Sequence, residues 1–179
     1  MLTSLALLLV AQGPVTAGPT ITLTLGNKKT VVIAVDAKGS PKTAAHILAL
    51  VGKKFYDGQV FHRVEPWVVQ WGDPDSKKGI NTPNLGNGGS GKTMPFETSK
   101  ISFMKGVVGI ASTGSKVGGD SQLFILTQDT PRLDGSYAVL GKVVSGMDEV
   151  MKIKRGDKIV SMRAKGKLQT TSSGKATRK

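Results

Sequence analysis

The sequence predicts a mainly β domain, either a barrel or a sandwich, accompanied by two helices. Short β-branched segments recur between turn residues, and only two segments show helical spacing. The chain has 179 residues, which suits one sizeable domain. A hydrophobic content of 39% with 23 glycines and 8 prolines indicates a packed, turn-rich protein rather than a disordered one.

The strand signal begins with a hairpin. Residues 21–25 and 30–35 alternate or run β-branched on either side of Gly26-Asn27-Lys28-Lys29, a turn sequence. Further strands are predicted over residues 61–64, 67–71, 106–111, 121–127, 137–144 and 158–164.

Two helices are predicted between these strands. Ser40 offers an N-cap, Pro41 suits the first helical position, and Gly52 provides a stop after an apolar stripe at helical spacing. A second, short helix is expected over residues 147–151, where two acids lie in the first turn.

Composition excludes several kinds of site. The chain has no cysteine, which removes disulfides, zinc–cysteine sites and thiol catalysis. His46 and His62 are too far apart in the sequence for a short metal motif, so no metal is expected. No nucleophile elbow of the G-x-S-x-G type occurs, which argues against serine hydrolase chemistry.

The formal charge of +13 raises the question of a nucleic-acid partner. Part of the charge lies in the Ser/Thr/Gly-rich end of the chain, and residues 169–179 are predicted to be a flexible basic tail. Aromatic residues make up only 5% of the chain, and no helix presents a basic face. No specific nucleic acid is therefore expected.

Residues 1–17 resemble a signal peptide. Leu5 to Ala11 form an apolar run far too short to span a membrane, and Val15-Thr16-Ala17 supplies a small-residue cleavage site. No lysine or arginine precedes Lys28, so a buried or mis-started segment is the alternative. The expectation is an exported, periplasmic or secreted protein with no stable membrane span, whose folded domain covers residues 18–168.

Two of the predicted strands combine amides with apolar side chains on one face. Side chains two apart share a face, which pairs Val68 with Gln70 and Gln122 with Phe124. A ligand groove needs apolar walls and a few aimed polar groups, whereas a purely structural outer face is more often polar throughout. The pattern indicates a binding face.

Several motifs in order resemble the cyclophilin-type peptidyl-prolyl isomerases. They are Tyr56-Asp57-Gly58, Phe61-His62-Arg63-Val64, Gln70, Gly72-Asp73-Pro74, Ser121-Gln122-Leu123-Phe124-Ile125, Leu133-Asp134-Gly135 and Gly141-Lys142-Val143. The resemblance implies a closed eight-stranded antiparallel barrel capped by two helices, with the groove outside. It also implies a monomeric folding helper or chaperone for proline-containing peptides and unfolded proteins, without a cofactor.

The isomerase chemistry assigns roles to individual residues. Rotation of an X-Pro amide restores a lone pair on its nitrogen, so a fixed guanidinium from Arg63 would stabilise the transition state. The resemblance makes Gln70 its partner or a substrate ligand. Strand alternation turns His62 away from Arg63, so His62 is expected to be structural. The implied substrate-binding residues are Trp67, Val68, Ala111, Ser112, Gln122, Phe124, Leu133 and Tyr137.

Two departures from the family pattern affect the expected groove. The loop 65–70 is one residue short and carries Trp67 in place of a phenylalanine, so the groove is either narrowed or able to stack on the residue beside proline. Arg132 stands where many relatives carry an aromatic residue that contacts cyclosporin, which predicts weak inhibition by that drug.

Two other functions remain to be weighed. Residues 86–93 match the phosphate-loop pattern G-x-x-x-x-G-K-[ST], but the preceding residues are turn-rich and Pro95 follows at once, so a flexible loop is favoured. The other alternative is a catalytically weak module that only binds proline peptides on the same fold.

Overall fold

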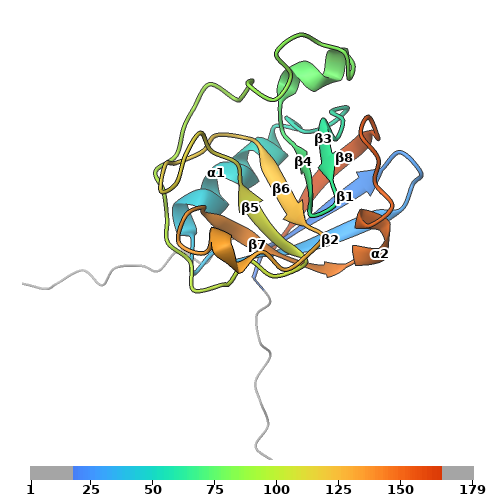
Figure 1. Ribbon diagram of the computed structural model, residues 1–179. Coiled ribbons are helices and arrows are strands. Elements are labelled where there is room, and N and C mark those ends of the chain that lie inside the picture. The colour runs from blue at the N-terminus through green and yellow to red at the C-terminus, as the bar shows by residue number, and fades with distance from the viewer. Residues whose placement is uncertain (1–17, 167–179) are drawn as a thin grey trace, which may run out of the picture.

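Eight antiparallel strands form one curled sheet in the computed structural model, which describes residues 18–166 (Figure 1). The strand order is β3-β4-β6-β5-β7-β2-β1-β8. The strands are β1 (Thr20–Leu25), β2 (Thr30–Val35), β3 (Arg63–Glu65), β4 (Val68–Trp71), β5 (Val107–Ile110), β6 (Leu123–Leu126), β7 (Val139–Ser145) and β8 (Ile159–Lys165). The predicted leader 1–17 and tail 169–179 lie outside the described residues.

Helical segments connect these strands. The α-helices are α1 (Pro41–Gly52) and α2 (Met147–Val150), and the 3₁₀ helices are η1 (Pro74–Lys78) and η2 (Pro131–Leu133). Both predicted α-helices are therefore confirmed, and each predicted strand overlaps an observed one. Helix α1 contacts β8 and β7, while α2 contacts β2.

The predicted cap of α1 is wrong in its chemistry. Ser40 makes no side-chain hydrogen bond to the helix. Instead the Glu97 carboxylate accepts hydrogen bonds from the N–H groups of Lys42 and Thr43, at 3.0 and 2.7 Å. A carboxylate satisfies the free N–H groups of a first turn and complements the helix dipole, so a residue distant in sequence replaces the local cap.

The sheet curls round almost to closure, but its two edge strands do not pair as a ladder. One isolated bridge joins Val60 to Lys158, just before β3 and β8 respectively. The Phe61 N–H also donates to the Asp157 carbonyl at 3.0 Å. The barrel is thus eight-stranded and antiparallel as expected, while its seam is held more loosely than "closed" implies.

The two faces of the sheet carry separate apolar clusters. The interior cluster includes Val69 and Trp71 of β4, together with Leu123 and Ile125 of β6. The alternate residues point to the outer face, where an apolar cluster contains Val68, Phe103, Val107, Phe124, Leu126 and Val139. Period-two alternation therefore gives the same strands a core face and a second apolar face, as the sequence predicts.

Candidate active site

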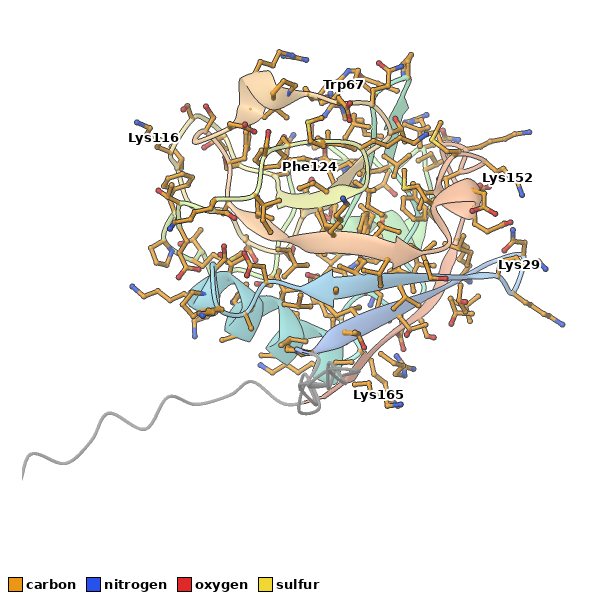
Figure 2. The ribbon with its side chains drawn as sticks, turned by 90° about the horizontal axis from the view of Figure 1, so that it is seen from below. Lys29, Trp67, Lys116, Phe124, Lys152 and Lys165 are labelled. Atoms are coloured by element: carbon orange, nitrogen blue, oxygen red, sulfur yellow. The ribbon has the colours of Figure 1, made fainter. Side chains whose placement is uncertain are left out.

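A groove of about 380 Å³ lies over the outer apolar cluster. Figure 2 labels two residues of this region, Trp67 and Phe124. The groove is lined by His62, Arg63, Trp67, Val68, Gln70, Leu85, Gly86, Asn87, Ala111, Ser112, Phe124, Leu133 and Tyr137. It combines apolar walls with one guanidinium and a few polar groups, which is the usual composition of a ligand site.

Phe124 forms the apolar floor of the groove. Its ring stacks on Phe103 at 5.8 Å between centroids and meets Tyr137 edge-on at 6.0 Å. Gly109 lies opposite on β5, where an added Cβ would come within 2.3 Å of the Phe124 ring. Because Gly109 has no side chain, the Phe124 ring can pack directly over it. The contacts with Phe103 and Tyr137 fix the orientation of the Phe124 ring.

Arg63 presents its guanidinium beside this floor and is held at two points. Its Nε donates to Glu65 Oε1 at 2.8 Å, and its Nη1 donates to Gln70 Oε1 at 3.1 Å. Glu65 lies two residues away on β3, while Gln70 faces Arg63 across the β3–β4 pair. Two fixed points restrict a side chain that would otherwise be highly mobile.

A relay of amide hydrogen bonds continues from Gln70. Gln70 Nε2 donates to Gln122 Oε1 at 2.8 Å. Gln122 Nε2 in turn donates to the carbonyls of Gly86 and Gly88, at 2.7 and 2.8 Å. Each amide is used as both donor and acceptor, so the relay fixes the orientation of the Gln70 oxygen that holds Arg63.

The far end of the relay rests on Asp73, whose side chain is fully buried. Its Oδ2 accepts from the N–H groups of Gly86 and Gly88 at 2.6 and 3.0 Å, and its Oδ1 accepts from the Asp75 N–H at 2.8 Å. A buried carboxylate with three donors is well satisfied.

The same contacts argue against a phosphate loop. The N–H groups of Gly86, Gly88 and Gly91 already donate to the carboxylates of Asp73 and Asp120. No helix follows this stretch before β5. A phosphate loop needs free N–H groups at a helix start, so the sequence match at residues 86–93 reflects a carboxylate-anchored loop.

Trp67 meets two guanidinium groups. The Cζ atoms of Arg63 and Arg132 lie 5.2 and 5.3 Å from the centre of its ring, within cation–π range. Its Nε1 donates to Glu65 Oε2 at 3.0 Å. Glu65 therefore bridges Arg63 and Trp67, and the Arg63 guanidinium holds the pKa of the Glu65 carboxyl below its usual value.

His62 is buried, as expected for a structural residue, but it also borders the groove. Neither ring nitrogen of His62 has a hydrogen-bond partner within residues 18–166. Burial lowers the pKa of His62 below its ordinary value, and the nearby Asp73 charge offsets this only in part. The neutral ring is therefore favoured near pH 7.

The structure brings the sequence-derived site residues together with one difference. Arg63, Gln70 and all the substrate-binding candidates except Gln122 line the groove. Gln122 lies behind Gln70, beside an adjoining hollow. The Ala111 N–H is bonded to the Gln122 carbonyl at 2.9 Å, and the Ser112 hydroxyl donates to the Gly114 carbonyl at 2.7 Å, so neither group is free.

Sequence reasoning missed Glu65, Leu85 and Asn87. Glu65 was recognisable in principle, because it follows Arg63 by two residues on a strand and must share its face. Leu85 and Asn87 reach the groove through the folded loop, which no local pattern reveals.

Residues 18–166 contain no group of three or more His, Cys, Asp or Glu side chains arranged to hold a metal ion. No helix in this range has both the length and the apolar character required to cross a bilayer.

Comparison with known proteins gives a consistent result. A family model described as "Cyclophilin type peptidyl-prolyl cis-trans isomerase/CLD" matches residues 20–173. The chain is 44% identical over 122 residues to a "Probable peptidyl-prolyl cis-trans isomerase" of Brucella abortus (strain 2308), covering 65% of this chain and 62% of that protein. The matched part is thus less than two thirds of the Brucella protein.

A second relative and two solved structures extend the comparison. "Peptidyl-prolyl cis-trans isomerase B" of Bacillus subtilis (strain 168) is 34% identical over 144 residues, which cover 79% of this chain and 93% of that protein. A Cryptosporidium parvum cyclophilin type isomerase superposes with a TM-score of 0.71 at 20% identity, covering 83% and 98% of the two chains. A crystal structure of that protein in the presence of the dipeptide Ala-Pro superposes with a TM-score of 0.70, also at 20% identity.

Proposed function

We propose that this protein, which belongs to the cyclophilin-type peptidyl-prolyl cis-trans isomerase family, catalyses rotation about X-Pro peptide bonds and so assists protein folding. The observation that carries the proposal is the Arg63 guanidinium, held by Gln70 and Glu65 beside an apolar pocket. Neither a nucleophile nor a cofactor is required, because the reaction breaks no covalent bond.

The chemistry follows from the amide itself. Resonance imposes a barrier of about 18–20 kcal/mol on rotation, and twisting the bond localises a lone pair on the nitrogen. A donor that bonds this nitrogen stabilises the twisted state more than the planar one, which lowers the barrier. Arginine suits the role because its guanidinium stays protonated and its donors lie in a fixed plane.

The groove suits a proline ring flanked by extended peptide. Phe124 forms the apolar floor and Val68 and Leu133 supply apolar walls, while Trp67 and Tyr137 also line the groove. In the proposed complex Ala111, Ser112 and Gln122 border the adjoining part of the peptide. The Ala-Pro dipeptide present with the Cryptosporidium protein supports proline-containing peptides and unfolded proteins as partners. A monomer is sufficient, because one chain supplies the whole groove.

Exchange NMR on a short X-Pro peptide tests the proposal. The full chain should accelerate cis–trans exchange, and Arg63→Ala should remove about a hundredfold of that acceleration, the typical loss for a key charge-stabilising donor. Lys29→Gln, which changes an exposed charge in the β1–β2 turn, serves as the control and should retain the wild-type rate.

The alternative, a catalytically weak module that binds proline peptides on the same fold, gives a different result in the same experiment. A module that only recognises proline would shift the peptide resonances without accelerating exchange. That result, with the full chain folded, would contradict the proposed catalysis and assign the groove to binding or chaperone activity.

We also infer export, because Leu5 to Ala11 and Val15-Thr16-Ala17 have the order of a signal-peptide core and cleavage site. N-terminal sequencing of the protein from fractionated cells tests this inference. A mature chain that begins near Gly18 outside the cytoplasm supports it, while a cytoplasmic chain that retains residues 1–17 contradicts it.

A further inference from the structure

Arg132 carries a positive charge that the described part of the chain does not neutralise. It lies in η2, one residue before Leu133, which lines the groove. Its side chain is exposed, and its guanidinium lies 5.3 Å from the centre of the Trp67 ring. Within residues 18–166 no carboxylate forms an ion pair with it. Its N–H donors are therefore available to a ligand.

The acidic residues of this region already have partners. Glu65 accepts from Arg63 Nε with one oxygen and from Trp67 Nε1 with the other. Asp134, two residues after Arg132, accepts from the Ser102 hydroxyl at 2.6 Å and from the Phe103 N–H at 2.7 Å. Within residues 18–166, both of these carboxylates are therefore engaged elsewhere, and neither forms an ion pair with Arg132.

Trp67 also restricts the position of the Arg132 guanidinium. A guanidinium stacked on an indole is attracted to the ring face and keeps its edge N–H groups exposed. Less side-chain entropy is then lost when a ligand binds, as for other preorganised binding groups. The arrangement matches the planar, two-oxygen geometry of a carboxylate.

We propose that Arg132 is a specificity-determining residue that favours substrates with Asp or Glu next to the X-Pro pair. The inference rests on the proposed isomerase function, because it names a substrate class for the same groove. A peptide whose proline packs against Leu133 carries one of its flanking residues past Trp67, where Arg132 meets it. An acidic side chain there supplies the ion-pair partner that Arg132 lacks within residues 18–166.

Two simpler explanations of an acidic preference or of an effect of Arg132 must be distinguished from a specific contact. The net charge of +13 attracts any acidic peptide without a specific contact. Alternatively, Arg132 merely covers Trp67, and its loss lowers stability without changing substrate choice. Lys29→Gln controls for net charge, since it removes one exposed positive charge at a distance from Trp67 (Figure 2).

The experiment compares peptides that share one X-Pro pair and carry Glu, Gln or Lys immediately before or after it. Exchange NMR gives the catalysed rate, and resonance shifts on titration give Kd. Wild type should favour Glu over Gln by about fivefold at one of the two flanks, the upper range for an exposed charge pair. High salt should reduce that preference.

The variants decide between the accounts. Arg132→Gln should abolish the Glu-over-Gln ratio, and Arg132→Glu should favour Lys, while Lys29→Gln keeps the wild-type ratio. The proposal is overturned if wild type and Arg132→Gln show the same Glu-over-Gln ratio, even if the variant has a lower Tm. It is also overturned if Lys29→Gln lowers that ratio as much as Arg132→Gln does.

The same experiment distinguishes failure of the proposed isomerase function from failure of the proposed role of Arg132. If exchange is not accelerated but the Kd ratio follows the Arg132 variants as expected, the acidic preference stands and the proposed catalysis falls. If no peptide is turned over or bound, both proposals are overturned.

Discussion

The two contacts that hold Arg63 differ in their surroundings. On the inner side, Gln70 belongs to a relay that runs through Gln122 to the loop fixed by the fully buried Asp73. On the outer side, the Arg63–Glu65 pair is open to solvent, with side chains 40% and 43% exposed. Buried, satisfied networks contribute more than surface ion pairs. The inner contact should therefore control Arg63 more strongly.

Replacing the anchor of the inner relay should have the largest effect. In Asp73→Asn the amide NH₂ faces N–H groups that need an acceptor, so buried donors are left unsatisfied. We expect the free energy of unfolding to fall by about 3 kcal/mol. Urea denaturation of both proteins measures the change.

The control for this prediction lies two residues away. Asp75 pairs with Lys78 at the surface, at 2.7 Å, so Asp75→Asn should change the free energy of unfolding by less than about 0.5 kcal/mol. Comparable losses in the two variants would mean that Asp73 is not a special anchor.

Breaking the relay nearer to Arg63 should affect catalysis. Gln70→Ala removes the acceptor for Arg63 Nη1 and leaves Gln122 Oε1 without its donor. We expect kcat/KM to fall about tenfold, equivalent to 1.4 kcal/mol of transition-state stabilisation. Gln128→Ala, at an exposed position, should leave it unchanged. A wild-type kcat/KM in Gln70→Ala would show that the relay does not position Arg63.

Breaking the outer contact of Arg63 should reduce kcat/KM less than breaking the inner contact does. Glu65→Gln removes the charge that pairs with Arg63, although its amide oxygen can still accept one hydrogen bond. We expect kcat/KM to fall by about two- to threefold at low salt, and the difference from wild type to shrink in high salt. The same exchange assay checks this. A larger loss than in Gln70→Ala would reverse the proposed order of the two supports.

The smallest expected effect is a pH dependence of stability that arises from His62. Its folded pKa lies below the unfolded value near 6.5, so the unfolded state binds more protons as the pH falls through that value. The stabilisation is present above about pH 6.5 and is lost progressively below it.

Unfolding measured at pH 7 and pH 5 tests this sign. The free energy of unfolding should fall more in wild type than in His62→Gln over this range. An identical pH dependence in the two proteins would remove His62 as the source.

The sequence predicts the fold well because local patterns dominate it. Alternation in β4 and β6 separates Val69 and Trp71 from Val68 and Gln70, and the structure follows that pattern. Pro41 and Gly52 mark the ends of α1. The resemblance to the family then identifies residues such as Phe124 and Leu133, whose apolar character alone indicates only a core position.

Contacts between distant parts of the chain are what the sequence does not predict. The Glu97 cap of α1 and the Asp73 carboxylate beneath Gly86 and Gly88 join segments with no shared pattern. The sequence likewise does not predict that Trp67 contacts both Arg63 and Arg132, while its expected effect on the groove stays a prediction. Such contacts depend on loop conformation rather than on periodicity.

The most direct test of the central claim is exchange NMR on the Arg63→Lys variant. Lysine keeps the positive charge but cannot bond Glu65 and Gln70 with two fixed N–H groups. If a positioned guanidinium drives the rotation, Arg63→Lys should bind the X-Pro peptide and lose most of the acceleration. Wild-type acceleration in Arg63→Lys would contradict this account and show that positive charge alone is sufficient.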